Sequence, residues 1–152
     1  MSVNLFAKYE MDPSKTAEGV RFDFEGITFI IKPSNSANRE YRYSLAIAAQ
    51  SFMHIFKAEP RDNSAVFAAN EEIQQIAFSE TVLIGWEGMV GRDGNPLEFS
   101  KAAALDLLKS CPTVWDELKG AAIDEDLFKP DPVADGESLG ESLSGSSSGE
   151  TD

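Results

Sequence analysis

The feature that most constrains the fold is a change of apolar periodicity, from every second residue near the N-terminus to every third or fourth residue after position 37. In the stretch VRFDFEGITFIIK, which begins at Val20, apolar and charged residues alternate up to the pair Glu25-Gly26. Alternation interrupted by a glycine-containing turn predicts a β-hairpin. Pro33 ends the returning strand, because proline has no backbone N–H to donate to a sheet.

The apolar spacing then becomes helical over residues 37–56, with one stripe formed by Tyr41, Leu45, Ala48, Phe52 and Ile55. Pro60 breaks this helix, and Ser64 is expected to cap the next one. The second helix runs towards Glu80 and has its own stripe, formed by Val66, Ala69, Ile73, Ile76 and Ala77. Two amphipathic helices joined by a short break predict an antiparallel helical hairpin.

The stretch VLIGWEGMVGRDGNPLEFS, residues 82–100, is interpreted as a structural corner. Its apolar start is expected to be buried and Trp86 to lie in the core, because flanking glycines let backbone approach the indole. Asp93-Gly94 is a tight-turn pair, and the apolar residues around it predict a short second hairpin that ends at the helix cap Ser100. The predicted structural motif therefore consists of Trp86, Gly88, Asp93, Gly94, Phe99 and Ser100.

Two short helices are predicted after this corner, with apolar positions at Ala103, Ala104, Leu107 and Leu108 and at Val114, Trp115, Leu118, Ala121 and Ala122. From Pro130 to Asp152 the chain has six acidic residues, no basic residue and no aromatic residue, so a disordered acidic tail is expected there. The prediction is an α+β fold, predominantly helical, with a domain at 1–129 and a Ser/Gly-rich tail at 130–152.

The charge balance restricts the partners. The chain has 26 acidic and 13 basic residues and a formal net charge of −13, whereas affinity for nucleic acid depends on cations. Arg39 and Arg42 lie beside aromatic residues, but Glu40 dilutes this cluster, so we interpret both arginines as solvent-facing. No apolar run approaches the roughly 20 residues that span a bilayer. We therefore expect neither a nucleic acid nor a membrane partner, and the single cysteine fits a reducing cytosol.

Residues capable of catalysis are few and scattered. His54 is the only histidine and Cys111 the only cysteine, too few for a zinc site of about four such ligands. We interpret His54 as a half-buried helix residue and Cys111 as a small packing residue. The carboxylates Asp93 and Glu98, and the run 124–126, lack calcium-loop spacing. The sequence therefore predicts no catalytic, cofactor-binding or metal-binding residues, and a binding protein rather than an enzyme.

The order of these segments resembles the tail assembly chaperones of long-tailed, siphovirus-like bacteriophages. The resemblance covers roughly Phe22 to Phe128 and rests mostly on the part from Val82 onward. It consists of a Trp-Glu-Gly triplet, an acidic-Gly turn, a Phe-Ser helix start with paired leucines, a proline break and a final Phe. These positions are Trp86, Glu87, Gly88, Asp93, Gly94, Phe99, Ser100, Leu107, Leu108, Pro112, Leu118 and Phe128.

The resemblance implies a binding function that has no catalytic step. Such chaperones bind the long, helical tape measure protein, keep it soluble and help the tail tube to assemble. A longer form made by ribosomal frameshifting recruits the tail tube protein. They act in the host bacterial cytoplasm and are absent from the mature virion. Several copies are expected along one tape measure chain. A homo-oligomer is also considered, but the sequence identifies neither the oligomeric state nor the partner-binding surface.

Two other classes of function stay open at this stage. The first is an acidic inhibitor that mimics DNA towards a basic host protein, although the densest acidic segment lies in the tail. The second is a small enzyme, which would need a pocket lined by polar groups.

Overall fold

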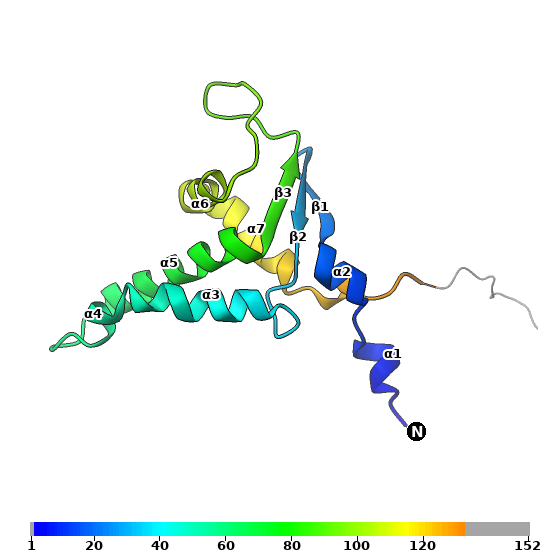
Figure 1. Ribbon diagram of the computed structural model, residues 1–152, viewed down its shortest axis with the longest axis horizontal. Coiled ribbons are helices and arrows are strands. Elements are labelled where there is room, and N and C mark those ends of the chain that lie inside the picture. The colour runs from blue at the N-terminus through cyan, green and yellow to red at the C-terminus, as the bar shows by residue number, and fades with distance from the viewer. Residues whose placement is uncertain (1, 133–152) are drawn as a thin grey trace, which may run out of the picture.

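The computed structural model describes residues 2–132. Most of the predicted acidic tail therefore lies outside the described residues. The body consists of a three-stranded sheet, a long helical hairpin on one side of it and two further helices packed beside the hairpin (Figure 1). This arrangement confirms the predicted α+β, predominantly helical class.

The sheet is antiparallel, in the order β1 (Val20–Phe24), β2 (Ile27–Ile31), β3 (Leu83–Glu87). The predicted hairpin β1–β2 is confirmed, with its turn at Glu25 and Gly26, both at positive φ (53° and 80°). The third strand was not predicted: the apolar run around Leu83 was expected only to be buried. It pairs with β2, and Trp86 faces Phe29 across this pair.

The helical hairpin is formed by α3 (Arg39–Gln50) and α5 (Asn63–Thr81), which run antiparallel, side by side (Figure 1). The prediction of one continuous helix over 37–56 was wrong. The helix ends at Gln50, and a turn separates it from the short α4 (Met53–Phe56). Phe52 and Ile55 therefore do not extend the α3 stripe. Periodicity alone could not place this break, because the apolar spacing continues through the turn.

The cap of α5 also differs from the prediction. The Asp62 carboxylate, not Ser64, accepts a hydrogen bond from the backbone N–H of Ala65, at 3.1 Å. Both residue types are good caps, but α5 begins at Asn63, so Asp62 stands at the cap position and Ser64 lies inside the helix.

Residues 88–99 form a protruding loop rather than a regular second hairpin (Figure 1). One isolated bridge joins Val90 to Pro96, so the loop folds back on itself as expected but without paired strands. Beyond it, the two predicted helices are confirmed as α6 (Lys101–Ser110) and α7 (Pro112–Ala122). A 3₁₀ turn, η1 (Glu125–Phe128), follows them.

Two short N-terminal helices were not predicted. They are α1 (Leu5–Tyr9) and α2 (Pro13–Glu18), capped by Asn4 and Asp12. Figure 1 shows α1 projecting from the body beyond α2, and α1 has no buried residue.

The core lies between the sheet and helices α5, α6 and α7. Phe29, Phe78 and Phe128 are among its largest fully buried side chains. Phe78 meets the Trp115 ring edge-on, with ring centres 5.0 Å apart. The Trp115 indole N–H donates to the Glu71 carboxylate, which satisfies its polar atom inside the core.

Candidate partner-binding surface

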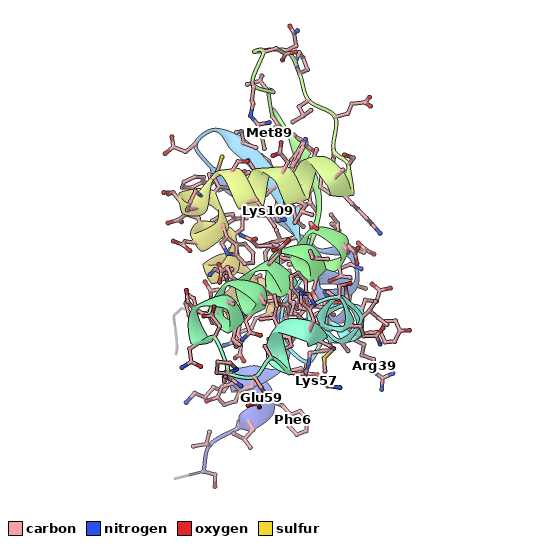
Figure 2. The ribbon with its side chains drawn as sticks, turned by 90° about the vertical axis from the view of Figure 1, so that its left-hand side faces the viewer. Phe6, Arg39, Lys57, Glu59, Met89 and Lys109 are labelled. Atoms are coloured by element: carbon pink, nitrogen blue, oxygen red, sulfur yellow. The ribbon has the colours of Figure 1, made fainter. Side chains whose placement is uncertain are left out.

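An open groove of about 550 Å³ lies beside the helical hairpin. It runs between α3, the C-terminal end of α5 and the start of α6. Its lining residues are Arg39, Glu40, Tyr43, Ser44, Ile47, Glu80, Thr81 and Lys101. We call it the α3–α5 groove. Figure 2 shows Arg39, at one end of it, on the periphery of the molecule.

The apolar part of the groove comes from two side chains one helical turn apart. Tyr43 is 70% exposed and Ile47 is 47% exposed. Residues four apart lie on the same face of a helix, so the two form a continuous apolar strip. Tyr41, only two residues from Tyr43, lies on the opposite face of α3, where burial raises the pKa of its phenol.

The rim of the groove is electrically balanced, with two basic residues (Arg39, Lys101) and two acidic residues (Glu40, Glu80). This local balance contrasts with the net charge of −13 for the whole chain. The buried Ser44 hydroxyl donates to Glu80 at 2.8 Å and holds that carboxylate at the rim. Such a surface can accept a largely apolar helix, because its centre is apolar and its four charged side chains cancel.

More apolar surface lies at the far end of the helical hairpin. Phe67 on α5 is 78% exposed and Met53 on α4 is 39% exposed. Figure 2 views this end directly, with Lys57 and Glu59 marking the connection between α4 and α5. Exposed apolar side chains of this size are a kind of surface that protein partners cover.

The residues of the predicted motif form the corner between the sheet and α6. The Trp86 indole N–H donates to the Leu97 carbonyl at 2.8 Å, and its ring meets the Phe99 ring edge-on at 4.9 Å. Ser100 caps α6 by accepting from the backbone N–H of Ala103 at 3.0 Å. Trp86 is 9% exposed, so the predicted core position is confirmed.

The loop turns also follow the predicted chemistry. Gly88 and Gly94 have φ of 85° and 83°, values that favour glycine. The Asp93 carboxylate accepts from the backbone N–H of Asn95 at 2.9 Å, which closes an Asx turn. None of the six motif residues lines the α3–α5 groove, so the motif builds the fold rather than the candidate surface.

Sequence reasoning missed an ion pair that ties the loop to α6. Arg92 donates to both carboxylate oxygens of Asp106, at 2.7 and 3.2 Å, and also to the Ser110 hydroxyl. The Arg92 hydrogen bond and the Ser110 hydroxyl lower the pKa of Asp106. Fourteen residues separate the two partners, and no local pattern points to the pair.

The residues considered for catalysis lie apart from one another. His54 is exposed on α4, so the expectation of a half-buried position was wrong: the turn after Gln50 carries it off the packed face of α3. Cys111 is partly buried between α6 and α7. Asp124 caps η1, by accepting from the backbone N–H of Asp126 at 3.1 Å.

Within residues 2–132, no three or more His, Cys, Asp or Glu side chains are grouped as a metal site would require. Across the same residues, no helix combines the length and the apolar character needed to cross a membrane.

Fold and groove together define a small α+β protein with an open groove beside its helical hairpin. The model of the family described as YdaY prophage protein matches residues 32–137, which is more than half of the 152-residue chain. The chain therefore belongs to the YdaY prophage protein family and is of phage origin. No curated protein matches it. No solved structure matches it either.

Proposed function

We propose that this protein is a tail assembly chaperone that binds the tape measure protein of its phage through the α3–α5 groove. The observation that supports the proposal most is the exposed strip of Tyr43 and Ile47 within a charge-balanced rim. Membership of a prophage family is consistent with a role in phage assembly. Binding of this kind involves no covalent step and needs only an apolar surface that is complementary to the partner.

The mechanism is the covering of apolar surface on another chain. An isolated tape measure helix exposes an apolar stripe, which drives aggregation unless another surface buries it. Packing of that stripe against Tyr43 and Ile47 buries apolar area on both partners. The net charge of −13 then keeps the complex dispersed through repulsion between copies.

The remaining parts of the proposal follow the resemblance to tail assembly chaperones. Several copies bind along one tape measure chain in the host bacterial cytoplasm, and none stays in the mature virion. A frameshift-extended form recruits the tail tube protein through residues added near the C-terminus.

The experiment is co-expression with the tape measure protein encoded by the same prophage. The wild-type chain is expected to keep the tape measure in the soluble fraction, and Ile47→Ser is expected to reduce that fraction. Ile123→Ser is the matched control, because Ile123 is also exposed (65%) but does not line the groove.

The possible outcomes test the chaperone function and the location of the binding surface separately. A tape measure that is equally insoluble with and without the wild-type chain contradicts the chaperone function. Equal solubilisation by the wild type and by Ile47→Ser keeps the function but moves the binding surface away from the groove. Displacement of DNA from a basic host protein by this chain would instead support DNA mimicry.

A further inference from the structure

We propose that the N-terminal arm, residues 3–9, of one copy docks into the α3–α5 groove of a second copy. This inference goes beyond the chaperone function, because no tape measure takes part. It assigns an occupant to the groove before any client arrives.

The first observation is the apolar character of the arm. Val3, Leu5, Phe6 and Tyr9 are 66%, 61%, 77% and 51% exposed. Within the arm, the hydrogen bonds are local, such as that from the backbone N–H of Ala7 to Asn4 at 3.1 Å. A helix of five residues is unstable in water by itself and depends on packing against another surface. The arm therefore has the composition of a docking segment without its partner.

The second observation is the fixed point from which the arm leaves the body. The backbone N–H of Asp12 donates to the Phe128 carbonyl at 2.8 Å, and Met11 packs against the core. Lys15 reaches the Lys129 carbonyl at 2.7 Å. The chain is thus held at residues 11–15, and Figure 1 shows α1 directed away from α3 of the same copy. This direction favours the groove of another copy over its own.

The third observation is that the arm and the groove each offer a side chain of opposite charge, Lys8 and Glu80. Residues 3–9 contain one charged side chain, Lys8, so the arm carries +1 on a chain of net −13. The Lys8 ammonium lies 5.4 Å from the centre of the Tyr9 ring and forms no ion pair within the described residues. In the groove, the Glu80 carboxylate accepts from Ser44 at 2.8 Å and forms no ion pair within the described residues. Lys8 of one copy and Glu80 of another are suited to pair.

The geometry has a consequence for assembly. Arm and groove are different surfaces, so each copy can donate one arm and accept another. Such head-to-tail contacts form open chains unless the rotation between copies closes a ring. A client helix that uses the same groove competes with the arm and shortens the chains.

The test is sedimentation velocity on the full chain over a range of concentrations, without any tape measure. The wild type is expected to form species that grow with concentration. The arm variant Leu5→Ser/Phe6→Ser and the groove variant Ile47→Ser are each expected to raise the dissociation constant about tenfold or more. Ile123→Ser is the matched control and is expected to associate like the wild type.

A mixture of the two variants gives the decisive result. The groove variant keeps an intact arm, and the arm variant keeps an intact groove, so an equal mixture is expected to form a dimer and no larger species. A wild type that stays monomeric at all concentrations overturns the proposal, as does association that both variants leave unchanged. Failure of the chaperone test would not affect this result, because the client is absent here.

Discussion

Trp86 connects three parts of the molecule through one side chain. It lies on β3 opposite Phe29, its ring meets Phe99, and its N–H binds the Leu97 carbonyl. The protruding loop is thus fixed at its returning end by a residue of the sheet. This explains why a loop with only one β-bridge holds a defined path.

Replacement of Trp86 by alanine is therefore expected to destabilise the protein by about 3–5 kcal/mol, because it leaves a large cavity and an unpaired carbonyl. Urea denaturation monitored by circular dichroism measures the change. Tyr43→Ala, at an exposed aromatic residue, is the control and should alter stability little. An unchanged midpoint for Trp86→Ala would contradict the core position of the indole.

The Arg92–Asp106 pair makes a prediction about titration. The pKa of Asp106 is lowered in the folded protein, so the pair stabilises the fold above the unfolded-state pKa of Asp106. That contribution is lost as the pH falls through the lowered value. In an NMR pH titration, Arg92→Ala is expected to raise the pKa of Asp106 towards its ordinary range, and Ser110→Ala to raise it less. Identical titration curves in all three proteins would rule the pair out in solution.

Local patterns were sufficient for most of the elements but not for all. The β1–β2 hairpin, α6, α7 and the Ser100 cap follow from alternation, helical spacing and cap chemistry. Strand β3 was missed because its partner, β2, is more than fifty residues away, and that pairing is a tertiary event. The arm helix α1 was missed because it has no buried face to create a stripe.

The start of α5 offers a direct test of capping. Asp62→Ala is expected to cost about 1 kcal/mol, because the Ala65 N–H loses its acceptor. Ser64→Ala should cost far less, since Ser64 lies inside the helix and α5 begins at Asn63. Thermal unfolding of the two variants compares them, and a larger loss for Ser64→Ala would place the cap where the sequence had predicted it.

The candidate surface could not be predicted from the sequence for a similar reason. The stripe that marks α3 as amphipathic, from Tyr41 to Leu45, is its packed side. Tyr43 and Ile47 lie outside that stripe, and in the sequence they look like single apolar residues on an otherwise polar face. They become a surface only once α5 and the start of α6 are placed beside them.

At the scale of the whole molecule, the proposed function predicts that the acidic residues of the C-terminal segment affect the solubility of the complex and not the binding of the tape measure. A variant that ends at Pro132 loses no basic residue and has a net charge of −8. The five acidic residues that it loses are Asp135, Glu137, Glu141, Glu150 and Asp152. It keeps Asp131 and its ion pair with Lys15. The variant is expected to bind a tape measure fragment as the full chain does, but to give complexes that are less soluble.

Turbidity of the complexes at equal concentration measures this difference. Added salt is the control, because screening of charge repulsion should make the full-length complex resemble the truncated one. Equal turbidity of both complexes at low salt would contradict a dispersing role for these acids.

The bond between Asp12 and Phe128 brings the beginning and the end of the described body to one spot. The last described residues, Asp131 and Pro132, therefore lie beside the root of the N-terminal arm. In a row of copies linked through their arms, this meeting point of the two ends of the described body would recur at every junction.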